Sequence, residues 1–98
     1  MKINFIGNYQ SGYVGEKADE LMLADRLTEL GHEVRRVPRD IWKAYADGEY
    51  NKAWTGQLPI KSDFNIICKW HHFDNVKYIY KLHKISNAPV FYWVWDYM

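Results

Sequence analysis

Two places in this 98-residue chain hold side chains that can accept a proton or bind a hydroxyl group. His71 and His72 are neighbours directly after one apolar run, and Asp96 directly follows another. Imidazole and carboxylate groups are frequent general acids and bases in enzymes. We therefore take His71, His72 and Asp96 as candidate catalytic residues, against the simpler interpretation that they cap or solvate the ends of their elements.

The histidine pair is a poor metal site as the sequence presents it. Consecutive residues of an extended chain point to opposite sides, so we expect at most one of His71 and His72 to face a cleft. No cluster of cysteines or acids lies beside them to complete a ligand set. We predict neither a metal nor a cofactor.

A glycine-containing loop between the first apolar run and the first helical segment is a candidate binding site. Gly7, Gly12 and Gly15 leave backbone amides free to approach a ligand at a helix N-terminus. Their spacing is not the G-x-G-x-x-G of dinucleotide sites, and no Gly-Lys-Ser/Thr of a P-loop occurs, which counts against those nucleotide enzymes. Unless the loop is an ordinary strand-to-helix connection, Gly12, Tyr13, Gly15 and Glu16 are candidate substrate-binding residues.

The helices and strands that must position these residues can be predicted from the periodicity of apolar residues and from the positions of glycine and proline. The stretch 47–59 is predicted to be irregular. We predict strands at 2–6, 32–37, 63–69 and 90–95, helices at 16–30 and 39–46, and a third helix that begins after Asp74 or Asn75 and ends near Ser86.

Alternation of strands and helices predicts one α/β domain over 1–98, a three-layer, Rossmann-like unit with a four-stranded parallel sheet. Right-handed crossovers favour the order 3-2-1-4. The first strand then lies inside the sheet, and the fourth, nearly all apolar, is covered on both faces. Ligands bind where the winding reverses, here between the first and fourth strands. That point would hold 8–15, Trp95 and Asp96, with 70–73 further along the edge.

Aromatic residues make up 17% of the chain, including five Trp and eight Tyr. Rings of this size usually fill the core of a small domain, but they also stack on flat or sugar-like ligands. Trp70 and Trp95 are the two whose positions at predicted strand ends fit a binding role, so we add them to the candidate substrate-binding residues.

Charge and cysteine content exclude several classes of protein. The net charge is +1 and the positive residues are scattered apart from Arg35, Arg36 and Arg39, which does not fit a nucleic-acid binder. The single cysteine, Cys68, rules out an internal disulfide and suits a reducing cytoplasm. We expect no signal peptide and no membrane span, because no apolar run approaches the roughly 20 residues that a span needs.

Four stretches, in this order, resemble motifs of one enzyme family. Gly15-Glu16 keeps the second glycine and the acid of a G-G-x-E loop, with Val14 in place of the first glycine. Gly31-His32-Glu33-Val34 matches G-H-E-V. The stretch 63–72, with Asp63 first and His71-His72 last, is similar to D-(I/V)-(I/V)-H-x-H. The stretch 89–96 is similar to P-V-V-x-x-x-H-D, with Trp95 in place of the histidine. The chain thus resembles the N-terminal domain of a GT-B type glycosyltransferase.

This resemblance covers the whole chain but only about the first half of such a domain. In the family, the N-terminal domain mainly binds the acceptor, and the nucleotide-sugar donor lies mostly on a C-terminal domain whose paired glutamates and basic residues are absent here. The resemblance implies that a sugar acceptor or nucleotide-sugar binds at the strand ends. It also implies that hexosyl transfer needs a second domain or a partner chain.

Two other functions remain open. The chain could be a non-catalytic Rossmann-like module that forms a homodimer or binds a protein partner through an exposed sheet edge, with the apolar fourth strand as the contact. A flavodoxin-like or receiver-like domain fits less well. The first strand lacks the acidic cluster of a receiver, and the glycine loop is poor in the Ser/Thr that hold a flavin phosphate.

Overall fold

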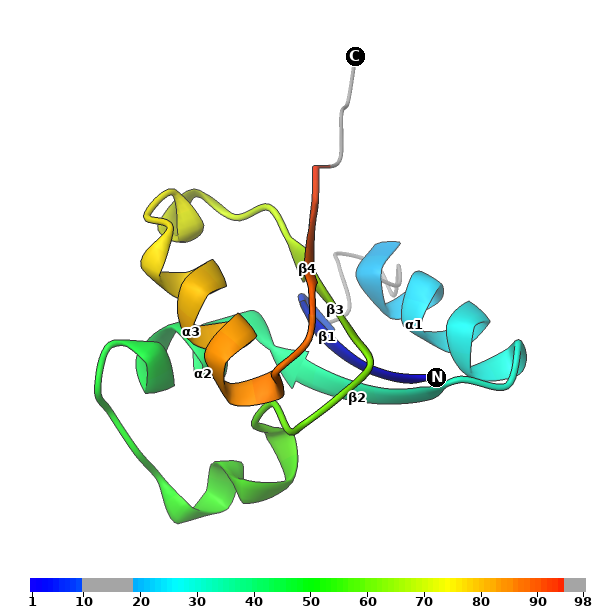
Figure 1. The fold of residues 1–98 in the computed structure, drawn as a ribbon, viewed down its shortest axis with the longest axis horizontal. Helices are drawn as coiled ribbons and strands as arrows, with labels where there is room; N and C mark the ends of the chain where they lie inside the picture. The colour runs from blue at the N-terminus through cyan, green and yellow to red at the C-terminus, as the bar shows by residue number, and fades with distance from the viewer. Residues whose placement is uncertain (10–18, 95–98) are drawn as a thin grey trace, which may run out of the picture.

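The computed structural model describes residues 1–9 and 19–94 as alternating strands and helices (Figure 1). The elements are β1 (Lys2–Gly7), α1 (Asp19–Glu29), β2 (Glu33–Pro38), α2 (Arg39–Ala46), the 3-10 helix η2 (Lys52–Gln57), β3 (Phe64–Cys68), the 3-10 helix η3 (His71–Phe73), α3 (Lys77–Ser86) and β4 (Val90–Trp93). The helix predicted at 39–46 is confirmed with both of its ends. No helix among the described residues is both long and apolar enough to cross a membrane.

The strands form one parallel sheet in the order β2-β1-β3-β4. The predicted parallel α/β architecture is confirmed, with β1 inside the sheet, but the predicted order 3-2-1-4 is wrong, because β3 pairs with β1 and not with β2. The connection from β2 to β3 spans 39–63 and is long enough to carry the chain past β1 to its free edge. This route leaves β2, which contains Arg35 and Arg36, at the edge of the sheet.

The helices cover both faces of the sheet, with α1 on one side and α2 and α3 on the other (Figure 1). Alternate residues of β1 supply the two cores: Phe5 packs toward α1, and Ile6 packs toward α2 and α3. Both side chains are fully buried, and burial of such a side chain stabilises the fold by about 1.5–3 kcal/mol. The α2/α3 core also contains the fully buried Trp42 and Leu82.

Local signals in the sequence end the helices where the structure ends them. Gly31 follows α1 with a φ of 95°, in the left-handed region where glycine is favoured, as predicted. Asn87 takes the same role after α3, with a φ of 53°. At the start of α3 the N-cap position is Val76, and neither predicted cap holds it; Asn75, one of the two, accepts a hydrogen bond from the backbone N–H of Lys77 at 3.0 Å.

β4 is only partly covered, which corrects the prediction that it is covered on both faces. The strand ends at Trp93 within the described residues, and Phe91 and Val94 are 50% and 52% exposed. The cause is the position of α1, which packs against β1 and β2 and leaves the β4 side of that face uncovered. An apolar run predicts a strand but not how many layers cover it.

A buried polar network joins the two inner strands near their amino ends. Asn4 and Asn65 are both fully buried. Nδ2 of Asn4 donates to the carbonyl oxygen of Ile60 at 2.6 Å, and Nδ2 of Asn65 donates to Oγ of Ser86 at 2.7 Å. The network therefore fastens the segment before β3 and the end of α3 to the middle of the sheet. Sequence analysis did not anticipate it.

Candidate functional site

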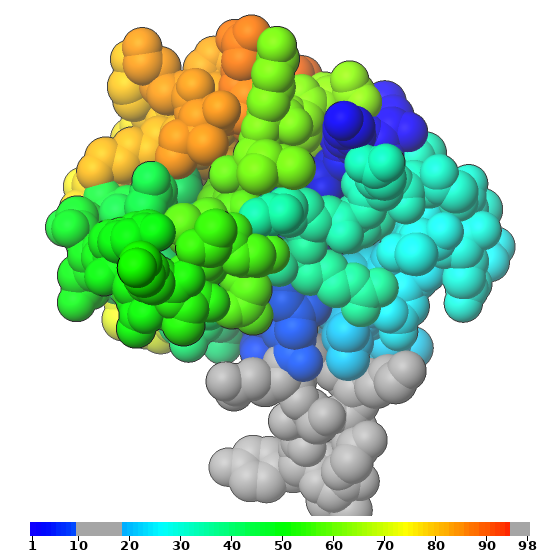
Figure 2. Space-filling model, turned by 90° about the horizontal axis from the view of Figure 1, so that it is seen from below, coloured from blue at the N-terminus to red at the C-terminus, as the bar shows by residue number. Residues whose placement is uncertain are grey.

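The candidate site is a crevice of about 480 Å³ at the carboxyl ends of β1 and β2, bordered by the residues that follow β3. Connections leave β1 and β3 toward opposite sides of the sheet, so this edge is the point where the winding reverses, and ligands of open α/β sheets bind at such points. Figure 2 shows the carboxyl end of β1 (blue) at the surface, between α1 (cyan) and the segment that follows β2 (green). The crevice is lined by Gly7, Asn8, Tyr9, Pro38, Arg39, Asp40, Ile41 and Trp70.

The end of β1 is built for close packing. A Cβ atom on Gly7 would lie 3.0 Å from Cβ of Glu20 and 3.0 Å from the ring of Phe5, so α1 approaches this strand only because the residue is glycine. Tyr9 packs its ring against Phe5 and donates its hydroxyl hydrogen to the Phe5 carbonyl oxygen. Burial raises the pKa of Tyr9 well above its ordinary value, so Tyr9 stays protonated and acts as an anchor of the wall.

Arg39 and Trp70 form the centre of the crevice. Arg39 is the first residue of α2, directly after β2. Its guanidinium carbon lies 4.5 Å from the centre of the Trp70 ring. Trp70 in turn packs against the α2/α3 core. A cation over an indole ring is attracted by about 0.5–2 kcal/mol, so the contact holds the guanidinium beside the ends of β2 and β3.

His71 and His72 lie next to this pair on η3, and both are exposed. Their ring centres are 3.9 Å apart, and the His72 ring is 4.4 Å from Trp70. The prediction that the two histidines point to opposite sides is wrong. It assumed an extended chain, whereas the 3-10 turn brings consecutive side chains together.

The protonation state of His72 follows from its neighbours. Partial desolvation, and then the positive charges of His71, Lys43 and Arg39, lower its pKa below the ordinary value of 6.5. The imidazole is therefore neutral at pH 7, and one ring nitrogen can accept a proton or a hydrogen bond. The crevice thus holds a guanidinium donor, and a neutral imidazole acceptor lies against the Trp70 ring that lines it. Among the described residues, no three histidine, cysteine or acidic side chains gather in a way that could hold a metal ion.

The structure brings part of the predicted site together. Trp70, His71 and His72 were expected further along the edge, and they adjoin the switch point itself because β3 and not β4 lies beside β1. Six predicted residues lie outside the described residues: Gly12, Tyr13, Gly15, Glu16, Trp95 and Asp96.

Two residues of the site were missed by sequence reasoning. Arg39 was noted only as part of a charge cluster, although its place directly after the Pro38 that ends a strand was a usable signal. Tyr9 carries no motif, and its role depends on its contact with Phe5, which only the folded chain shows.

Comparison of the chain with protein-family models, with curated proteins and with solved structures found no significant match. The resemblance to a GT-B glycosyltransferase domain therefore stays a hypothesis, and what the structure establishes is an α/β chain with a four-stranded parallel sheet.

Proposed function

We propose that the crevice binds a sugar acceptor or a nucleotide-sugar, in a three-layer, Rossmann-like domain of the glycosyltransferase kind. The observation that carries the proposal is the guanidinium of Arg39 held on Trp70, beside two exposed imidazoles, at the switch point of a parallel sheet. The volume of about 480 Å³ is within the roughly 300–1,000 Å³ of small-molecule sites. The motifs at 31–34 and 89–96 support the same class.

Each residue has a distinct role in this proposal. Arg39 offers several N–H donors in a fixed plane, which suit the oxygens of vicinal hydroxyl groups or of a diphosphate. His72 supplies the acceptor, and His71 lies against it. Trp70 is a positioning residue, because its ring already carries Arg39 and packs against the core, which leaves its face unsuited to stacking on a sugar.

Hexosyl transfer would form a bond between the acceptor oxygen and the anomeric carbon and break the bond from that carbon to the diphosphate oxygen. The proton of the acceptor hydroxyl would pass to a base, for which His72 is the candidate, and the nucleoside diphosphate would leave. The departing diphosphate needs more positive groups than this crevice offers. We therefore infer that transfer requires a second domain or a partner chain. Cys68 is buried and is the single cysteine of the sequence, which fits a reducing compartment, so we expect the protein in the cytoplasm.

The test is saturation-transfer NMR of the chain with a panel of nucleoside-diphosphate sugars and free sugars. We expect binding in the range of about 1 mM, and a loss of about ten-fold on Arg39→Gln, because a charged hydrogen bond contributes about 1.5–3 kcal/mol. His72→Gln tests the acceptor, and Asp96→Ala and Gly12→Val test the predicted residues outside the described part.

Lys61→Gln is the matched control for Arg39→Gln, because Lys61 is exposed and lies outside the crevice. Its affinity for the same sugars should equal that of the unsubstituted chain. A folded protein that binds none of the panel, or that binds equally well after Arg39→Gln, contradicts the proposal.

A second candidate function, self-association, is favoured by the position of β4. Among the described strands β4 pairs with β3 alone, so its outer edge faces no other described strand and is open to a strand from a second copy. Phe91 and Val94 are half exposed, and Val76 and Tyr80 nearby are 70% and 57% exposed. A groove of about 320 Å³ is lined by Val76 before α3, by Ile79, Tyr80 and His83 of α3, and by Val90 of β4. A second copy of the chain would cover this surface by antiparallel pairing of the two β4 strands.

Sedimentation equilibrium over a range of concentrations distinguishes this function from the first. A dimer that dissociates after Phe91→Lys but persists after Met22→Lys supports it, because Met22 is equally exposed but lies on α1. A monomer at every concentration excludes it.

A further inference from the structure

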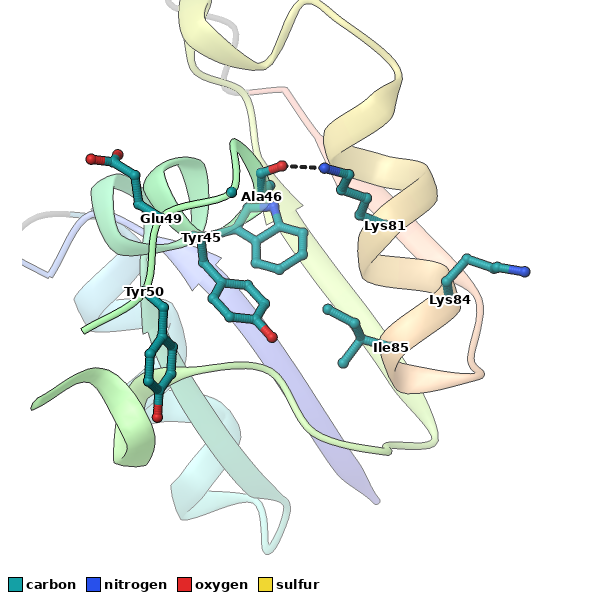
Figure 3. A pocket seen from close by; sticks show the side chains of 9 residues that line it. Tyr45, Ala46, Glu49, Tyr50, Lys81, Lys84 and Ile85 are labelled. Carbon is teal, nitrogen blue, oxygen red and sulfur yellow. Dashed lines mark hydrogen bonds between the residues drawn. The ribbon is translucent and has the colours of Figure 1, made fainter. Parts of the chain in front are cut away.

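A second cavity lies between α2 and α3, away from the strand-end crevice (Figure 3). Its volume is about 470 Å³, which is also within the range of small-molecule sites. It is lined by Trp42, Tyr45 and Ala46 of α2, by Gly48, Glu49 and Tyr50 of the segment after it, and by Lys81, Lys84 and Ile85 of α3. None of these residues lines the crevice, so the cavity is a separate place on the molecule.

Three aromatic rings form one wall of the cavity, from the core to the surface. The ring centres of Trp42 and Tyr45 are 6.2 Å apart, and those of Tyr45 and Tyr50 are 6.4 Å apart with an edge-on arrangement. Trp42 is fully buried, whereas Tyr50 is 64% exposed. Figure 3 shows Tyr45 facing Ile85 across the space. An apolar side chain opposite a row of rings suits a flat aromatic group between them.

Hydrogen-bond donors dominate the polar groups around this space. Nε1 of Trp42, which can only donate, is the one buried side-chain nitrogen or oxygen without a hydrogen-bond partner among the described residues. Leaving such a group unpaired costs about 1–3 kcal/mol. Tyr45 and Tyr50 likewise bring hydroxyl groups with no hydrogen bond to the described part of the chain. A ligand that carries acceptor oxygens would satisfy the hydroxyl groups of Tyr45 and Tyr50, which lie nearer the surface.

The charged side chains at the rim also favour a ligand with acceptor oxygens. Lys81 donates to the carbonyl oxygen of Ala46 at the end of α2, and Nζ of Lys84 lies 5.7 Å from the centre of the Tyr80 ring, on the outer side of α3. Lys84 can therefore turn to a ligand without giving up a hydrogen bond. The carboxylate of Glu49 is directed away from Tyr45 and Ile85 in Figure 3. The local field is thus positive and favours an anion.

From this geometry we infer that the cavity binds a small aromatic carboxylate. The ring of the ligand lies along Tyr45 and Tyr50 and against Ile85. Its carboxylate faces the Lys84 ammonium, at the exposed end of the wall that begins with the buried Trp42. This site is independent of the sugar site, and one can be absent while the other is present.

The test uses 2-naphthoate as the probe and the indole N–H signals of the five Trp residues as the readout, in ¹H–¹⁵N spectra of the ¹⁵N-labelled chain. The Trp42 signal is assigned through its contacts with Tyr45. We expect it to shift in a saturable way, with a dissociation constant of about 1 mM, as expected for a ligand of this size at roughly 0.3 kcal/mol per heavy atom. The uncharged 2-naphthalenemethanol should bind several-fold more weakly.

Substitutions locate the binding. Lys84→Gln should weaken naphthoate binding by about two- to five-fold, as expected for one exposed charge pair. Tyr50→Ala should weaken it by about five-fold through the loss of one ring contact. Both side chains are exposed, so neither variant endangers the fold. Lys61→Gln, an exposed lysine elsewhere, should have no effect.

Three results would overturn the inference. One is a Trp42 signal that does not move at about 10 mM naphthoate, ten times the expected dissociation constant. Another is equal binding of 2-naphthalenemethanol, which would remove the role of the charge. The third is naphthoate binding that is lost after Arg39→Gln and kept after Lys84→Gln, which would place the anion in the strand-end crevice.

Discussion

Nδ2 of Asn4 donates a hydrogen bond to Oδ1 of Asn65 at 2.8 Å, between adjacent positions of the two inner strands. The bond requires the register seen in the sheet, because a shift of one strand by one residue would place the two asparagines on opposite faces of the sheet. A pair of apolar side chains at these two positions would not require this register in order to pack. The two amides therefore specify which strand lies beside β1 and in which alignment.

Replacement of one amide should be more damaging than its size suggests. We expect Asn65→Leu to lower the free energy of unfolding by about 2–3 kcal/mol, because it removes partners from Asn4 and Ser86 in a buried setting. The double variant Asn4→Leu/Asn65→Leu should lose less than the sum of the single losses. Urea denaturation measures all three. The control, Asn51→Leu, affects one exposed cap and should cost below about 1 kcal/mol; an equal loss there would contradict a special role for the buried pair.

Two glycines form a matched pair for the packing of α1 on β1. We expect Gly7→Ala to lower the free energy of unfolding by about 1–3 kcal/mol, because the new Cβ atom would lie 3.0 Å from Glu20 and from Phe5 in a packed region. Gly56→Ala meets no atom within 4 Å and should change stability by less than about 0.5 kcal/mol. The measurement is urea denaturation of the two variants under the same conditions. Similar midpoints would contradict the prediction, because they would mean that α1 can shift from β1 without loss of stability.

Asp47, which caps α2, should contribute to the acid sensitivity of the fold. Hydrogen bonds from Lys43, Lys77 and Tyr78, each of 2.8 Å, hold the pKa of its carboxyl group far below the ordinary value of 3.8. A carboxyl whose pKa is lower in the folded state stabilises the fold fully above the unfolded pKa and loses that effect as the pH falls.

The urea midpoint should thus decline below about pH 4, and Asp47→Asn should make that decline shallower. The control is Asp40→Asn, which removes an exposed acid that forms no ion pair with the described residues. If the two variants show the same pH profile, the three contacts of Asp47 do not persist in solution.

The charges around His72 should be visible in its own titration. Since the positive charges of Lys43 and Arg39 help to lower the pKa of His72, we expect Arg39→Gln and Lys43→Gln each to raise it. The measurement is the pH dependence of the His72 Hε1 chemical shift by NMR. Lys61→Gln should leave the titration unchanged, and an unaltered midpoint in the Arg39 variant would mean that the guanidinium lies further from the ring than the structure has it.

Local signals were enough for most of the fold. The ends of α2 and the strand that contains Cys68 follow from a few neighbouring residues, and both are confirmed. The strand order could not be obtained in this way, because it depends on which edge of β1 the stretch 39–63 reaches. Asn4 and Asn65 hold that information, but it can be read only once the two strands are known to be neighbours.

The candidate site was predictable in part for the same reason. Trp70, His71 and His72 were identified because a strand end followed by polar and aromatic residues is a sequence-level pattern. Arg39 was not, since its importance comes from a ring that is distant along the chain. The orientation of the two histidines was mistaken because their 3-10 turn has no strong sequence signature.

The buried amide network has a consequence for how this chain can change. It secures the amino ends of the inner strands together with the segments that contain Ile60 and Ser86, whereas the crevice lies at the opposite ends of the same strands. The amide network therefore stabilises the fold through side chains other than Arg39, His71 and His72 at the strand-end crevice. Exposed positions such as His71 and His72 should tolerate extensive mutation with little loss of foldability, which makes that rim the natural place to alter specificity by directed evolution.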